Sequence, residues 1–94
     1  MGIVTSTVYQ QQYRSMREDI KYKMDLIGQT KVNLTGQITE LVNSATDLEP
    51  GSPMAKQLQA RIEKLHQLEK KLDMQLTAYQ AQLKSIDEAE QHVQ

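Results

Sequence analysis

Apolar residues recur at alternating spacings of four and three along the second half of the chain, from residue 58 to residue 93. This alternation is typical of a helix that packs along one continuous seam against another helix. Ser52 is suited to cap the start of such a helix, and Pro53 is suited to its first turn. We therefore predict a helix from about residue 53 to about residue 92. Its seam residues are Leu58, Ile62, Leu65, Glu69, Leu72, Leu76, Tyr79, Leu83, Ile86, Glu90 and Val93.

The first half of the chain repeats the same spacing and predicts a helix from about residue 5 to about residue 46. Gly28 and Gly36 each lower its stability by about 1 kcal/mol relative to alanine. We expect residues 28–36 to be its weakest part, where the helix either bends or lets another helix approach closely. The seam residues of this helix are Tyr13, Arg17, Ile20, Met24, Ile27, Lys31, Leu34, Ile38, Leu41, Ala45 and Leu48.

Residues 47–52 separate the two patterns and have the composition of a turn. Pro50 disfavours helix at the residue before it, and Gly51 permits a positive φ. Ser52 and Pro53 then start the second helix. Two helices of similar length joined by a short turn should fold back on each other. The predicted fold is therefore all-α, a single domain formed by a long antiparallel hairpin of coiled-coil type.

The distribution of charge favours the same fold. Residues 1–31 carry a net charge of +2, residues 32–53 carry −3, residues 54–71 carry +3 and residues 72–94 carry −3. Folding back at the turn places segments of opposite sign side by side. A parallel dimer of straight helices would instead stack segments of like sign. Each pair of charges contributes little, but the sign pattern selects the antiparallel orientation.

Two registers of the hairpin are compatible with the seam. If the numbers of facing residues sum to about 99 or 100, Lys31 faces Glu69, and the two charges form one polar layer. A sum near 103 would leave Lys31 against Leu72 and Glu69 against Leu34. We prefer the first register, because a lone charge in a seam is costly unless it is paired.

A hairpin has only one layer of helices, so on its own it should be marginally stable. The chain also carries apolar residues away from the seam. They either widen the core of an assembly with three or four helices or form a docking surface for another protein or another copy. We therefore expect a homo-oligomer, with a helical protein partner as the alternative. These residues are Val4, Val8, Tyr9, Met16, Leu26, Val42, Met54, Leu68 and Met74.

Composition narrows the class of protein. The net charge of −1 creates no field that would attract nucleic acid, and no apolar run is long enough to span a membrane. The first residues do not resemble a cleaved signal peptide, so we expect a cytoplasmic protein or one secreted without such a signal. The sequence MGIVTS fits the loose pattern for myristoylation of Gly2, which leaves attachment to a membrane as a weaker alternative.

No constellation of residues predicts an enzyme or a cofactor. Glu63 and His66 have the spacing found in di-iron helical bundles, but such a site needs two of these motifs and further inward glutamates. Both residues flank the seam, so we interpret them as solvated. There is no cysteine and no glycine-rich phosphate loop. We expect no catalytic residues, no metal and no cofactor.

The turn Pro50-Gly51-Ser52-Pro53, the residues 55–59 that follow it, and Tyr79 in a long second helix resemble a needle subunit of type III secretion systems. The resemblance covers residues 48 to about 90. It implies two helices joined by a Pro-x-x-Pro turn and copies stacked into a hollow tube. Secreted proteins of the WXG type and small secretion chaperones are similar in shape, although the Trp-x-Gly motif is absent. We predict a non-enzymatic structural subunit of a filament or needle, with a soluble helical adaptor or secretion chaperone as the alternative.

Overall fold

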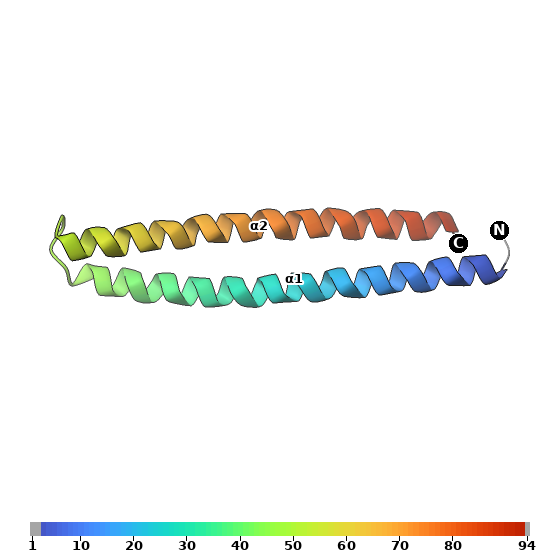
Figure 1. Ribbon diagram of the computed structural model, residues 1–94, viewed down its shortest axis with the longest axis horizontal. Coiled ribbons are helices and arrows are strands. Elements are labelled where there is room, and N and C mark those ends of the chain that lie inside the picture. The colour runs from blue at the N-terminus through green and yellow to red at the C-terminus, as the bar shows by residue number, and fades with distance from the viewer. Residues whose placement is uncertain (1–2, 94) are drawn as a thin grey trace. The chain divides into compact units, whose positions relative to one another are not determined.

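The computed structural model describes the backbone of residues 3–93 and the side chains of residues 5–92. It contains two helices, α1 (Ile3–Thr46) and α2 (Pro53–Val93), which are joined by the turn at residues 47–52 (Figure 1). There is no strand within residues 3–93. The prediction of an all-α helical hairpin is confirmed, and the helix bounds lie within about two residues of those expected.

The two glycines of α1 do not interrupt it, since helical structure continues through Gly28 and Gly36. No other group lies within 4 Å of the place where a Cβ atom would stand on either glycine. The expected close approach of another helix therefore does not occur within the described chain. Thr39 adds a local hydrogen bond, because its hydroxyl donates to the Thr35 carbonyl at 2.9 Å.

The turn between the helices is built by the residues predicted to form it. The Ser52 amide donates to the Glu49 carbonyl at 3.2 Å, and Gly51 has a φ of 83°. Proline followed by glycine with positive φ is the arrangement of a type II turn. The Ser52 hydroxyl then accepts a hydrogen bond from the Ala55 amide at 3.2 Å and caps the N-terminus of α2.

The chain divides into two units along its helices, and each is described by itself. Unit 2 is Ile27–Met74, in which the end of α1, the turn and the start of α2 form a helical hairpin. Unit 1 pairs the start of α1 (residues 3–26) with the end of α2 (residues 75–93). That the chain forms a single hairpin domain stays a prediction.

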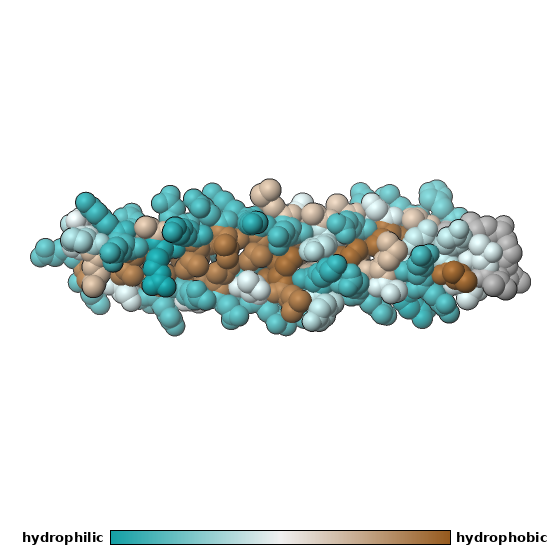
Figure 2. All heavy atoms as spheres, viewed as in Figure 1, coloured by the Kyte–Doolittle hydropathy of each residue, from teal (hydrophilic) through white to brown (hydrophobic). Residues whose placement is uncertain are grey.

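The least exposed side chains lie on the predicted seam. In unit 2 they are Leu34, Ile27 and Ile38, which are 5%, 8% and 9% exposed, and in unit 1 they are Ile20 and Ile86, both 6% exposed. No side chain of the described residues is less than 2% exposed. Figure 2 shows apolar side chains at the surface between rows of polar ones, on the face in view. The seam is therefore covered by one layer of helices only.

Candidate functional site

The two charged residues in the seam of unit 2 do not pair with each other. The ammonium group of Lys31 forms an ion pair with the carboxylate of Asp73. Glu69 instead accepts a hydrogen bond from the Thr35 hydroxyl at 3.3 Å. The prediction that Lys31 faces Glu69 in one polar layer is therefore wrong.

The register explains this correction. In the contacts Lys31–Asp73 and Thr35–Glu69 the two residue numbers sum to 104, close to the register that was not preferred. In that register each charge lies against an apolar residue, but its long side chain places the apolar stem in the seam and the charged end at the rim. Each long charged side chain reaches sideways to a partner at the rim, so no charge is left unpaired in the seam. The cost of an unpaired charge therefore does not favour one register over the other.

Heptad positions describe this arrangement. When the seam residues are assigned to positions a and d, the residue after each d is e, and the residue before each a is g. We call the two sides of the seam the e flank and the g flank after these positions. The charged seam residues occupy position a, and three of them contact an e residue of the facing helix, whereas Glu90 contacts Arg17. The contacts with e residues are Lys31–Asp73 and Glu69–Thr35 in unit 2 and Arg17–Asp87 in unit 1.

The e flank is therefore bridged by polar contacts within the chain. In unit 1 the Arg17 guanidinium lies 3.1 Å from Asp87 Oδ1 and also forms an ion pair with Glu90. In unit 2 Glu69 Oε1 additionally lies 3.1 Å from His66 Nδ1. Near the turn this flank opens into a groove of about 540 Å³ whose lining includes Val42 and Gln59.

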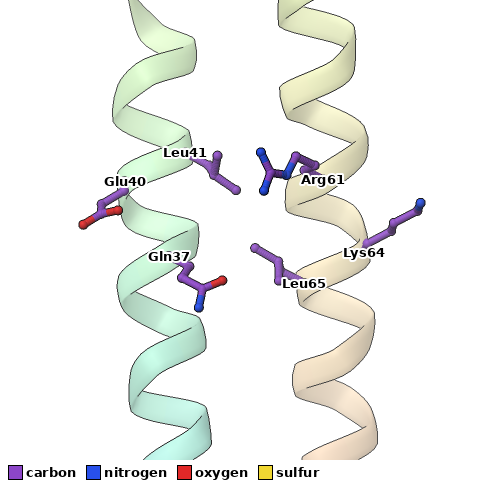
Figure 3. A pocket seen from close by; sticks show the side chains of 6 residues that line it. All are labelled: Gln37, Glu40, Leu41, Arg61, Lys64 and Leu65. Atoms are coloured by element: carbon purple, nitrogen blue, oxygen red, sulfur yellow. The ribbon is translucent and has the colours of Figure 1, made fainter.

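The g flank of unit 2 contains an open groove of about 420 Å³. Leu41 and Leu65 are directed into the space between the helices, and Arg61 extends into the same space (Figure 3). Glu40 and Lys64 point away from it on opposite sides, so one rim is acidic and the other is basic. The lining is completed by Gln37.

The charged residues around this groove have no ionic partner among the described residues. Among the described residues Glu40, Arg61 and Lys64 form no ion pair, in contrast to the seam residues Lys31 and Arg17, which pair with carboxylates on the e flank. An apolar floor with a charged, unpaired rim is typical of a surface that contacts another protein. The g flank of unit 2 is therefore the strongest candidate for a functional site.

Unit 1 has a groove of about 360 Å³ on its own g flank, lined in part by Met16, Ile20 and Ile86. Lys23 lies on the same flank, with its ammonium nitrogen 6.0 Å from the centre of the Tyr79 ring. A hydrogen bond and ion pair with Asp19, at 2.9 Å, raise the pKa of Lys23 above its ordinary value of 10.5. The g flank of unit 1 thus carries a paired charge, whereas the charged residues at the groove of unit 2 form no ion pair among the described residues.

Sequence reasoning treated the apolar residues outside the seam as one set and did not separate the flanks. Four of those that are exposed lie at g positions and enlarge the apolar surface of the g flank, whereas Tyr22, Val32 and Met74 lie on the outer face of their helices. The heptad position of each residue was the signal that could have revealed the difference. The four g residues are Tyr9, Met16, Met54 and Leu68.

The other predicted seam residues are partly exposed rather than buried, which agrees with a single layer. They are Tyr13, Met24, Leu41, Ala45, Leu48, Leu58, Ile62, Leu65, Leu72, Leu76, Tyr79 and Leu83, and the side chain of Val93 lies outside those described.

The structure also bears on three further features of the sequence, namely metal binding at Glu63 and His66, a membrane span and the modification of Gly2. His66 contacts Glu69 rather than Glu63, and within the described side chains no group of three potential ligands could hold a metal ion. Neither helix, over the residues described, has a stretch that is apolar and long enough to cross a membrane. Gly2, the candidate for myristoylation, lies outside the described residues.

Comparison of the chain with protein-family models, curated proteins and solved structures finds no significant match. The resemblance of the turn to needle subunits therefore stays a prediction. The fold and the two flanks carry the functional argument.

Proposed function

We propose that the chain is a non-enzymatic structural subunit that assembles with copies of itself through its helices. The observation that carries this proposal is the seam of unit 2, which has one layer of helices and an uncovered g flank. A helix surface with apolar residues is stabilised when a further helix covers it. Covering the g flank would bury the floor of the groove without breaking any contact of the e flank.

The solvent-exposed area of the chain is large enough for an interface with a second chain. The chain exposes 7282 Å². A protein of 10.8 kDa folded around a single core exposes roughly 5,500 Å². The excess of roughly 1,700 Å² is larger than the area of roughly 800 Å² that each partner contributes to a standard interface. One interface of ordinary size therefore fits on this chain with area to spare.

A filament or needle is the more specific form of the proposal, suggested by the resemblance of the turn Pro50-Gly51-Ser52-Pro53. Growth into a filament needs contacts that do not close on themselves, and hence a second surface on each copy. The exposed apolar residues of the outer faces, Tyr22 in unit 1 and Val32 and Met74 in unit 2, are suited to that role.

The test is a concentration series of the purified chain followed by light scattering and negative-stain electron microscopy. A filament subunit will show a critical concentration and fibres. A non-filamentous structural subunit will form small oligomers of fixed size without any partner. A chain that remains monomeric at every concentration would contradict self-assembly in both forms.

A soluble adaptor or secretion chaperone is the second candidate, and the groove of unit 1 favours it. Met16, Ile20 and Ile86 form an apolar lining there, and the nearby Lys23 is already paired with Asp19. Such a groove suits an apolar helix of another protein. An adaptor will stay monomeric alone, and circular dichroism will show more helix in its complex than in the two separate proteins, because the bound segment of the partner becomes helical.

A further inference from the structure

We propose that the g flank of unit 2 is covered by a second copy of this chain, packed face to face in the same orientation, with the turns of both copies at one end. The proposal rests on the self-assembly proposed above and specifies its geometry. In it, the α1 rim of each copy lies against the α2 rim of the other. Glu40 of one copy then lies beside Arg61 and Lys64 of the second copy.

Acidic and basic residues lie on opposite sides of the groove of unit 2 (Figure 3). Glu40 lies on the α1 side, and Arg61 and Lys64 lie on the α2 side (Figure 3). A two-fold axis parallel to the helices exchanges the two sides, so that acid meets base twice in one dimer. A two-fold axis perpendicular to the helices would place α1 on α1 and α2 on α2, so that rims of like charge would face each other.

Glu40 and Lys64 lie at the same height along the helix axes of unit 2. The contacts of the e flank pair residues whose numbers sum to 104, and Glu40 and Lys64 also sum to 104. They therefore stand at the same height on the two helices. A rotation about an axis parallel to the helices preserves height. Glu40 thus reaches Lys64 of the second copy without any sliding of one hairpin along the other.

The other residues on the two rims of unit 2 occupy heptad position c, which directly precedes each d position. At matching heights Asn33 would face Lys71 of the second copy, and Asp47 would face Gln57 of the second copy. Neither pair has like charges. These outer rim positions of unit 2 therefore tolerate this orientation, and Leu41 and Leu65 supply apolar area for burial. Four helices packed with antiparallel neighbours form a standard bundle.

Charge exchange between two variants tests the proposal. Glu40→Lys creates repulsion against Arg61 and Lys64 of the second copy, and the double variant Arg61→Glu with Lys64→Glu creates repulsion against Glu40. Each variant alone should have a dissociation constant about tenfold higher than the unchanged chain, because each dimer loses two attractive contacts and gains two repulsive ones. An equimolar mixture should recover the original affinity within about threefold, since the heterodimer restores opposite charges at both rims.

Sedimentation velocity measures these affinities, and Glu63→Lys is the matched control. Glu63 is an exposed glutamate on the outer face of the same unit, so its substitution makes the same charge change away from the groove. It should leave the dissociation constant within about twofold. Circular dichroism on each sample separates weakened association from loss of helix.

The results separate a failure of the proposed self-assembly from a failure of the proposed contact at the g flank. If the unchanged chain is monomeric throughout, the proposed self-assembly fails. If the unchanged chain associates but both variants associate equally well, self-assembly stands and the second copy does not occupy the g flank. If both variants are weakened and their mixture is not restored, the pairing of Glu40 with Arg61 and Lys64 is wrong.

Cross-linking gives an independent measure of orientation, because the chain has no cysteine. A mixture of Glu40→Cys and Lys64→Cys chains should give a mixed disulfide or a product with a short thiol cross-linker. If Glu40→Cys chains instead cross-link to one another in preference, α1 lies against α1 and the proposed orientation is overturned.

Discussion

The e flank and the g flank border the same apolar seam but satisfy their polar groups differently. On the e flank, charged seam residues such as Lys31 and Arg17 reach carboxylates of the facing helix. On the g flank of unit 2, Glu40, Arg61 and Lys64 surround an open groove and have no ion pair within the described chain. The difference indicates that the e flank holds polar contacts between the facing helices, whereas the g flank of unit 2 leaves its charges without an ion pair among the described residues.

The largest expected effect is a loss of stability from a substitution in the seam, which borders both flanks. Leu34→Ala removes the least exposed side chain of unit 2. It should lower the free energy of unfolding by about 2–3 kcal/mol, as for large-to-small changes in a core. Urea unfolding followed by circular dichroism measures this change.

The neighbouring Val32→Ala is the control, since Val32 is 73% exposed on the outer face. It should change the free energy of unfolding by less than about 0.5 kcal/mol. If the two substitutions had equal effects, the seam would not be the part that stabilises the hairpin.

The second effect separates the g flank from the outer face. Leu68→Gln places a polar group on the apolar surface of the g flank, where Leu68 is 47% exposed. The dissociation constant for self-association should rise about tenfold, because each of the two partners loses part of a leucine's buried area, roughly 0.7 kcal/mol each.

Met74→Gln is the matched substitution on the outer face of the same unit, where Met74 is 72% exposed. Its effect on the small oligomer should be below about twofold in analytical ultracentrifugation. A larger effect from Met74→Gln than from Leu68→Gln would assign the contact to the outer face and not to the g flank.

The seam and the turn could be predicted from the sequence because both depend on local patterns. The 3-4 spacing placed Ile20, Leu34 and Ile86 on the buried side, and Pro50 with Gly51 marked the turn. The register could not be predicted in the same way. Lys31 has a side chain long enough to reach Asp73 beside the seam, so pairing across the seam was not required. Separating the flanks also needed the structure, because spacing alone does not show which polar groups already have partners.

The third prediction removes the ion pairs of the e flank in unit 1. Arg17→Met keeps an apolar stem in the seam and removes the ion pairs with Asp87 and Glu90. It should lower the free energy of unfolding by about 1 kcal/mol, and less at high salt, because these groups are only partly shielded from solvent. Self-association through the g flank should change little.

Arg14→Met provides the comparison for Arg17→Met, since Arg14 is exposed in the same unit and forms no ion pair among the described residues. Its unfolding free energy should remain within about 0.5 kcal/mol of the unchanged chain. Equal losses for both arginines would show that net charge matters and that the specific contacts do not.

The fourth prediction uses Gly28, which occupies an e position of α1. Nothing lies within 4 Å of a Cβ added there, so Gly28→Ala should raise the free energy of unfolding by about 0.5–1 kcal/mol through helix propensity alone. Self-association should not change, because the e flank is not the contact surface. A Gly28→Ala chain that folds well but no longer associates would place another chain on the e flank.

The smallest effect concerns Lys23 on the g flank of unit 1. Its pKa is raised by the hydrogen bond and charge of Asp19, so the contribution of this pair is fully present below the ordinary pKa of 10.5 and is lost as pH rises through the raised value. In Asp19→Asn the pKa of Lys23 should fall towards 10.5. A nuclear magnetic resonance titration of the Lys23 side chain measures it, and an unchanged pKa would exclude Asp19 as the cause.

The reactivity of single cysteines tests most directly whether another copy covers the g flank. Gln37→Cys lies on the g flank of unit 2 and Gln59→Cys on the e flank of the same unit, and both positions are exposed in a chain without other cysteines. Raising the protein concentration through the association range should slow alkylation of Gln37→Cys at least about tenfold and leave Gln59→Cys unchanged. Equal reactivity of both cysteines in the associated protein, or protection of Gln59→Cys alone, would contradict the account.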